Sequence, residues 1–200
     1  MNATPPPLVR RRRAQLVLIA LLFFGPLGLA FYAYYGGSLI PARHTNHGEL
    51  VVPARTLPAA GLVSAGGTAA PAGLMRGTWT LVQLTGGACE ASCQAALAAS
   101  RAARLGLHEP DRVRRLLIVD AACCASPLAA AADDLTLVWL DGEAGRRVAA
   151  TFPGYAAGAP AGQTYLVDPL GNLMMSYPAG APAKGMLKDL EHLLRLSHIG

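Results

Sequence analysis

The feature that most constrains this chain is an uncharged apolar run from Ala14 to Tyr35. A helix of about 20 apolar residues is long enough to cross the hydrocarbon core of a bilayer, and this run meets that length. Pro26, near its middle, is tolerated in a membrane helix because neighbouring groups can satisfy the freed backbone. The sequence therefore predicts one transmembrane helix at residues 14–35, in contact with membrane lipid.

Four consecutive arginines, Arg10–Arg13, end the basic segment formed by residues 1–13. The positive-inside rule places this segment in the cytoplasm and the chain beyond the helix on the opposite side. We therefore expect a single-pass protein of the cell inner membrane with its C-terminal domain in the periplasm. A cleaved signal peptide is the alternative, but the apolar run is longer than usual for one and no clean small-x-small cleavage site follows it.

The basic charge of the chain belongs mainly to this membrane flank. The formal net charge is +5, whereas residues 36–200 carry 13 Lys and Arg against 12 Asp and Glu. The sequence shows no basic stripe with interleaved aromatic residues, which is the footprint of a nucleic-acid-binding surface. We therefore expect no nucleic-acid partner.

The part of the chain beyond the helix divides by composition. Residues 36–75 are rich in Gly, Pro and Ala, which is typical of a tether, although residues 48–53 allow a short strand. Residues 76–200 are long enough for one compact domain with its own core and too short for two. We thus predict a tether at 36–75 followed by a single domain at 76–200.

Periodicity within this domain predicts alternating strands and helices. We expect strands at 79–84, 114–120 and 135–140, helices at 89–105, 127–132 and 184–197, and a hairpin at 164–177. In the first of these helices, Leu97 and Leu105 are expected to face inward. Such alternation predicts an α/β domain with a mostly parallel centre and an antiparallel edge.

Cys89 and Cys93 carry the strongest chemical signal in the sequence. They follow the first predicted strand and a Gly-Gly break, so both lie at the start of the next helix. Residues four apart share a helical face, and a helix N-terminus favours a thiolate. Such a pair can exchange with another disulfide or bind a soft ion such as Cu(I). A plain structural disulfide is the alternative interpretation.

Other candidate ligands remain open at this stage. Cys123 and Cys124 follow the second predicted strand, where they can be buried small residues, disulfide partners or metal ligands. His44 and His47 lie in the predicted tether, where they can help hold copper or be solvated loop positions.

The motifs WTLVQLTGGACEASC, LLIVD and TYLVDPLGNLMMSYP resemble the thioredoxin-like Sco/SenC family over roughly residues 76–198. The segments at 44–50 and 168–200 are similar to SCO-like membrane proteins of proteobacterial oxidase gene clusters. The resemblance implies a thioredoxin-like domain in which Cys89 and Cys93 match the family's CxxxC motif. It also implies a cytochrome c oxidase assembly factor that handles copper or maintains thiols, with an oxidase subunit or another copper carrier as partner.

The chain departs from the family pattern at the third copper ligand. The family places a His about eight residues before the Asp that corresponds to Asp168, a position occupied here by Pro160. The sequence has no His between Ala149 and Gly180. Two thiolates still suit Cu(I), but this departure favours thiol redox work or an interaction scaffold. The CxxC of ordinary thioredoxins is also absent, although a general periplasmic thiol–disulfide oxidoreductase remains an alternative.

Overall fold

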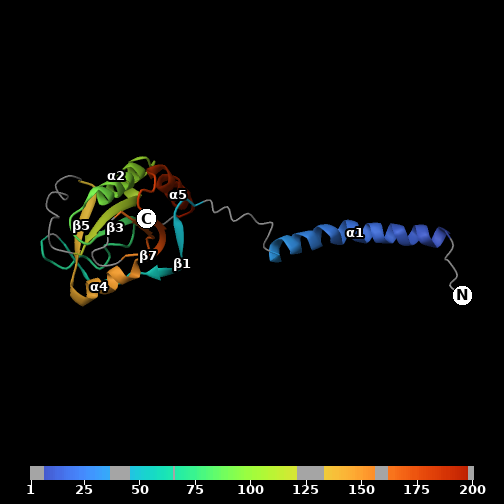
Figure 1. Cartoon of the computed structure of the whole chain (residues 1–200), viewed down its shortest axis with the longest axis horizontal. Helices are drawn as coiled ribbons and strands as arrows, with labels where there is room; N and C mark the ends of the chain where they lie inside the picture. The colour runs from blue at the N-terminus through green and yellow to red at the C-terminus, as the bar shows by residue number, and fades with distance from the viewer. Residues whose placement is uncertain (1–6, 37–45, 65, 121–132, 156–161, 198–200) are drawn as a thin grey trace. The chain divides into compact units, whose positions relative to one another are not determined.

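The computed structural model describes residues 7–36, 46–64, 66–120, 133–155 and 162–197, with side chains from Arg11 onward (Figure 1). The chain divides into two units, Met1–Thr45 and Asn46–Gly200, which are considered separately.

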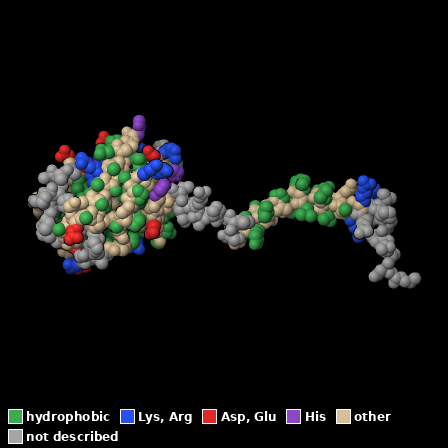
Figure 2. Space-filling view, turned by 45° about the horizontal axis from the view of Figure 1, so that its top comes forward, with side chains coloured by type: hydrophobic (Ala, Val, Ile, Leu, Met, Phe, Trp, Pro, Cys, Tyr) green, Lys and Arg blue, Asp and Glu red, His purple; other side chains and the backbone are tan. Residues whose placement is uncertain are grey.

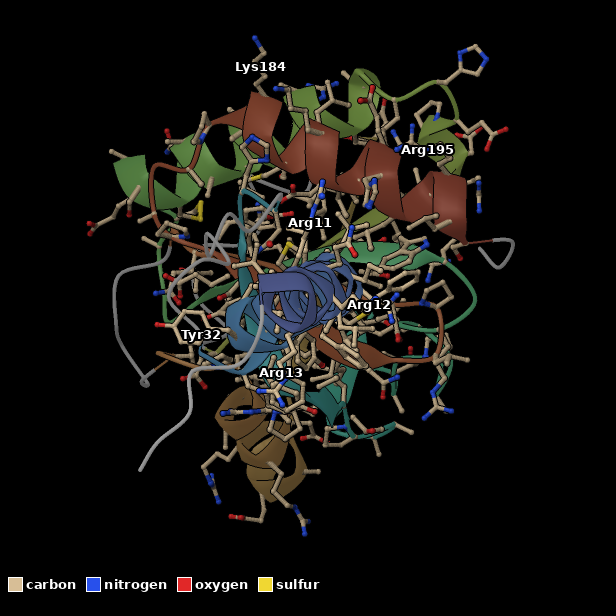
Figure 3. The ribbon with its side chains drawn as sticks, turned by 90° about the vertical axis from the view of Figure 1, so that its right-hand side faces the viewer. Arg11, Arg12, Arg13, Tyr32, Lys184 and Arg195 are labelled. Carbon is tan, nitrogen blue, oxygen red and sulfur yellow. A yellow bond between two sulfur atoms is a disulfide. The ribbon has the colours of Figure 1, made fainter. Side chains whose placement is uncertain are left out.

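The first unit contains helix α1, Pro7–Tyr35, in which Pro26 lies inside the helix. Within it, Arg11–Tyr35 contains an 18-residue stretch with a mean hydropathy of 2.3, and it has the length and composition needed to cross a membrane. Hydrophobic side chains lie along α1, with arginines at one end (Figure 2). Arg11, Arg12 and Arg13 come from that end, and Tyr32 comes from the opposite end (Figure 3). The predicted apolar helix is thus confirmed, and α1 begins before the apolar run.

The second unit is built on a seven-stranded sheet ordered β1-β7-β6-β3-β4-β5-β2. Its parallel centre consists of β3 (Trp79–Thr85), β4 (Val113–Val119) and β5 (Leu135–Leu140). The hairpin of β6 (Thr164–Val167) and β7 (Asn172–Tyr177) adds antiparallel strands beside β3. These five strands confirm the predicted α/β architecture.

Helices cover both faces of the sheet (Figure 1). Helices α2 (Ala91–Leu105) and α5 (Ala183–Leu196) contact each other on one face, with the 3₁₀ turn η1 at Pro110–Arg112. Lys184 and Arg195 mark the two ends of α5 (Figure 3). Helix α4 (Gly142–Thr151) lies against the other face and was not expected from the sequence. Its two glycines, Gly142 and Gly145, are weak helix formers, which explains why propensity alone misses it.

One inward-facing prediction is wrong. Leu97 is buried, but Leu105 is 60% exposed. The buried positions of α2 recur every three or four residues: Cys93, Ala96, Leu97, Ser100 and Ala103. Leu105 lies two positions beyond Ala103, and two residues turn a helix by about 200°, so its side chain points to solvent. The short helix predicted at 127–132 lies outside the described residues.

Alternate residues of the central strands fill two different cores. Val82, Leu116 and Tyr165 pack with Phe152 and Val148 on the α4 face. On the other face, a second core joins side chains of β3, β6 and β7 to α2 and α5, and a smaller cluster surrounds the cysteines. This alternation is the period-two pattern of a strand buried on both sides.

The compact unit begins earlier than the domain expected from composition. Residues assigned to a tether form β1 (Glu49–Thr56), which pairs with β7, and β2 (Leu62–Ser64), which pairs with β5. Buried Asp189 of α5 fixes the start of this segment. Its carboxylate accepts hydrogen bonds from the backbone N–H of His47 (2.9 Å) and Gly48 (3.0 Å) and from the Tyr177 hydroxyl (3.1 Å). We call these four residues the Asp189 clamp.

Candidate functional site: a buried cysteine pair at the start of a helix

The cysteine pair lies where β3 gives way to α2. After β3, the Thr85 hydroxyl donates a hydrogen bond to the Gly87 carbonyl (3.2 Å), which closes a tight turn before Cys89. Helix α2 then begins at Ala91, so Cys93 lies in its first turn. Cys89 and Cys93 form a disulfide with their Cα atoms 5.1 Å apart. The expected convergence of the two sulfurs is therefore confirmed.

The disulfide is buried unequally. Cys89 is 8% exposed and Cys93 only 2%. Apolar side chains of α2, β4 and β5 surround the pair: Leu97, Leu117, Val119 and Leu137, with Leu135 and Trp139 packed against them. Of the two cysteines, Cys89 is thus the more accessible to an attacking thiol.

The start of α2 favours negative charge on these sulfurs. Glu90 occupies the N-cap but makes no capping hydrogen bond with its side chain. The first N–H groups of a helix carry a partial positive charge, which stabilises a nearby thiolate. Gln94 holds the turn by donating from Nε2 to the Cys89 carbonyl (3.0 Å). The local backbone is therefore arranged to support a thiolate when the disulfide opens.

The two cysteines suit a soft monovalent ion better than a metal that needs three protein ligands. Within the described residues, no three His, Cys, Asp or Glu side chains are grouped closely enough to hold a metal ion. Two thiolates alone suit Cu(I), whereas Cu(II) needs harder ligands that this set does not supply. If the reduced pair carries copper as cargo, Cys89 and Cys93 are the residues that would hold it.

Of the remaining candidate ligands, only His47 lies within the described residues, and it does not join this pair. His47 belongs to the Asp189 clamp, where its Nδ1 lies 3.0 Å from Asp189 Oδ1. Its ring also lies close to Gly185, where an added Cβ would be 3.0 Å from His47 Cβ. His44, Cys123 and Cys124 lie outside the described residues.

Two nearby side chains were not singled out in the sequence. Trp139 reaches the cysteine cluster from β5, and the buried Arg115 lies below it in β4. Trp139 is recognisable in sequence only as a strand residue. Arg115 gives a weak signal, since an arginine next to the apolar run of a central strand is unusual.

The chain belongs to the family described as "Transmembrane-like, thioredoxin-like, C-terminal domain", whose model matches residues 79–197. No curated protein matches the chain. Solved structures of Sco proteins are among those with a similar fold.

Apo Sco1 from Thermus thermophilus is 17% identical, with a TM-score of 0.55 over 76% of this chain and 99% of that one. Arabidopsis thaliana ScoI with copper bound is 15% identical, with a TM-score of 0.51 over 68% and 96%. BsSco, a member of the Sco family of cytochrome c oxidase assembly proteins with a disulfide switch, is 14% identical, with a TM-score of 0.55 over 72% and 96%. At such identities these structures show a shared fold.

Proposed function

We propose that this chain is a membrane-anchored assembly factor for cytochrome c oxidase that acts in the periplasm through Cys89 and Cys93. The observation that carries the proposal is the buried disulfide at the N-terminus of α2, with Cys89 as its more accessible sulfur. The pair would keep the copper-site cysteines of a partner in the redox state needed for metallation. The partner would be an oxidase subunit or another copper carrier.

A purely structural role explains this disulfide poorly. The bridge closes a loop of only five residues, Cys89–Cys93. In the chain-entropy model such a loop stabilises a fold by only about 2 kcal/mol. The surrounding domain already has two larger apolar cores, so a short staple adds little to it. A thiolate-favouring helix start is also of no use to a disulfide that never opens.

Exchange between the Cys89–Cys93 disulfide and a partner dithiol needs no further oxidant. A partner thiolate attacks the Cys89 sulfur, a mixed disulfide forms, and Cys93 leaves as a thiolate. A second partner thiolate then attacks the partner sulfur of the mixed disulfide, and Cys89 is released. The partner dithiol loses two electrons and becomes a disulfide, while Cys89 and Cys93 gain them. Run in reverse, the same steps reduce a partner disulfide.

Copper handling is the second mode of the same pair. The reduced thiolates present the soft ligands that Cu(I) prefers, and their burial among apolar side chains limits access of water. In this mode copper is cargo to be passed on, and a site with two protein ligands leaves room for a ligand from the acceptor.

A redox titration tests the exchange mode. The full chain in detergent, carrying Cys123→Ser and Cys124→Ser so that only one pair reports, is equilibrated with glutathione buffers. We expect a reduction potential above about −300 mV, the upper end of the structural range. A pair that stays oxidised below that value is a structural staple, and the proposal fails.

A Cu(I) titration of the same reduced chain tests the copper mode. We expect about one Cu(I) per chain, held in competition with a Cu(I) chelator, and loss of this binding in Cys89→Ser/Cys93→Ser. Equal uptake by both forms would assign the copper elsewhere. A general oxidoreductase would show a suitable potential but no Cu(I) binding and no preference for an oxidase copper-site peptide.

A further inference from the structure

An arginine is buried in the middle of the sheet, close to the cysteine pair. Arg115 lies in the central strand β4, and only 1% of its surface is exposed. A buried charge is costly unless it is paired and hydrogen-bonded. Its neighbour Arg114 points to the opposite face, where Nη1 donates to the Leu74 carbonyl. The two adjacent arginines thus provide a buried residue and a matched control.

Arg115 donates hydrogen bonds to α2 and to one carboxylate. Its Nε donates to the Ser100 hydroxyl (3.1 Å), and Nη2 donates to the Leu97 carbonyl (2.6 Å). Its Nη1 lies 3.0 Å from both oxygens of Asp134. The guanidinium therefore fixes the second turn of α2 against β4.

Both partners of this buried pair remain ionised. Burial lowers the pKa of Arg115, and Asp134 opposes that shift by hydrogen bonding and charge. Burial also raises the pKa of Asp134, but the hydrogen bond and charge of Arg115 outweigh it and leave the pKa below its usual value. An arginine in a protein keeps its charge in any case.

The local charges do not cancel. Helix α2 adds Arg101, whose Nε lies 3.6 Å from Asp134, and Arg104, whose Nη1 lies 3.6 Å from the same carboxylate. Three arginines therefore surround one carboxylate. Within the part of the chain that the structure describes, one further acid is paired with this group: Asp111, whose side chain is 99% exposed and contacts Arg104. Among the described residues, the cluster carries an excess of positive charge.

The arginine cluster is connected to the cysteine pair through Leu97 and Leu117. Leu97, whose carbonyl Arg115 holds, is one helical turn from Cys93 and packs in the same apolar cluster. That turn corresponds to roughly 6 Å along the helix. Leu117, also in the cysteine cluster, is two positions beyond Arg115 on β4, or roughly 7 Å. Leu97 and Leu117 thus connect the guanidinium to the cysteine cluster, and in a buried setting unit charges interact more strongly than they do in water.

We propose that Arg115, with Asp134, Arg101 and Arg104, is a positioning residue that raises the reduction potential of the Cys89–Cys93 pair. The excess positive charge stabilises the thiolates of the open pair and does not affect the neutral disulfide in the same way. The guanidinium also holds the α2 turn that carries Cys93. This inference rests on the proposed exchange function and concerns how readily that disulfide is reduced.

The test compares reduction potentials of full-length variants in detergent, in the Cys123→Ser/Cys124→Ser background, with glutathione as the probe. Arg115→Met should lower the equilibrium constant for reduction about tenfold, which is about 30 mV for a two-electron couple. Asp134→Asn removes the carboxylate that the three arginines surround and should shift the potential upward. Arg114→Met, on the opposite face of the same strand, should leave it unchanged.

Two further variants separate charge from packing. Arg115→Lys keeps the charge but loses the planar fork, so its potential should stay near wild type while its stability falls. Arg101→Gln changes a half-exposed side chain and should lower the potential without threatening the fold, which covers the case in which Arg115→Met does not fold.

Opposite shifts for Asp134→Asn and Arg101→Gln support the inference. Potentials that stay at the wild-type value, or that fall in every variant together with stability, overturn it and leave Arg115 as a packing residue. Failure of the proposed function looks different, because the wild-type pair would then not be reduced by glutathione at all.

Discussion

Gly162 lies directly against Ser92, the residue that precedes Cys93 in α2. A Cβ placed on Gly162 would be 3.2 Å from the Ser92 Cβ and 3.1 Å from the Ala179 Cβ. Its φ of +151° is also one that side chains rarely adopt. The backbone before β6 thus approaches the cysteine-bearing turn so closely that an added Cβ would force its neighbours to shift by a few tenths of an ångström.

Gly162→Ala should therefore lower stability and disturb the disulfide turn. Strain at such a φ costs about 1–3 kcal/mol, and the crowded Ser92 must also shift. Urea unfolding of the full chain in detergent measures the first effect, and the rate of reduction by glutathione measures the second. Gly67→Ala is the control, since Gly67 has a φ of +75° but open space around it. It should lose stability without a change in the reduction rate; equal rates in both variants would contradict the prediction.

Trp139 should report the redox state of the cysteine pair. It packs against the cluster that contains Cys89 and Cys93, and a nearby disulfide quenches indole emission by accepting an electron. Reduction should therefore raise tryptophan fluorescence. The chain has two tryptophans, and Trp79 belongs to the other apolar core on that face. The increase should persist in Trp79→Phe and vanish in Trp139→Phe, and the reverse pattern would place the quencher elsewhere.

Removal of the disulfide should weaken the fold only modestly. Cys89→Ser/Cys93→Ser should lose about 2 kcal/mol of unfolding free energy, the loop-closure contribution of a five-residue ring. Far-ultraviolet circular dichroism should stay unchanged, because the two large apolar cores around Val82 and Leu190 do not depend on the bridge. Collapse of the fold in the double variant would instead assign the pair a structural role.

Alkaline pH should destabilise the domain through Tyr165. Burial raises the pKa of this phenol to about 12, whereas an unfolded tyrosine titrates near 10. Between about pH 10 and 12 the unfolded chain binds fewer protons, so stability falls as pH rises, by about 1.4 kcal/mol per pH unit. Unfolding measured across this window should show a shallower decline in Tyr165→Phe. An identical decline in both would mean that Tyr165 ionises equally in the folded and unfolded chains.

The Asp189 clamp should control how firmly the first residues of the compact unit are held. Asp189→Ala removes the acceptor of the His47 and Gly48 N–H groups and of the Tyr177 hydroxyl. Of these, the Gly48 and Tyr177 groups are buried, at a cost of about 1–3 kcal/mol for each one left unpaired. Amide hydrogen exchange in β1 should accelerate selectively. Glu191→Gln, on the same helix, is the control and should behave as wild type. Unchanged protection of β1 in Asp189→Ala would show that its pairing with β7 suffices.

The sequence allowed prediction of elements with local signals and missed those made by distant contacts. Apolar runs and turn residues located β3, β5 and the β6–β7 hairpin within a few residues. The short strand allowed at residues 48–53 corresponds to β1, but the sequence did not place it inside the compact domain, because its pairing partner β7 lies more than a hundred residues away. Domain composition carries no signal of such a long-range partner.

The candidate site was likewise predictable where it depends on local spacing and not where it depends on distant contacts. Spacing alone brought Cys89 and Cys93 together, because four residues on a helix define a geometry. The roles of Arg115 and Gly162 were not visible, since they depend on which face a strand turns toward α2 and on which loop lies beside Ser92. The similarity to SCO-like proteins of proteobacterial oxidase gene clusters stays a prediction.

The Asp189 clamp also limits how far the compact unit can lie from the end of α1. With residues from Asn46 onward folded into the compact unit, only residues 37–45 separate it from the last turn of α1. Whatever conformation they take, they span at most roughly 35 Å. A partner in the same membrane within that radius would meet Cys89 at an effective concentration on the order of millimolar, whereas a freely diffusing thiol protein gains no such advantage. Under the proposed function, this short connection would favour partners in the same membrane over soluble thiol proteins.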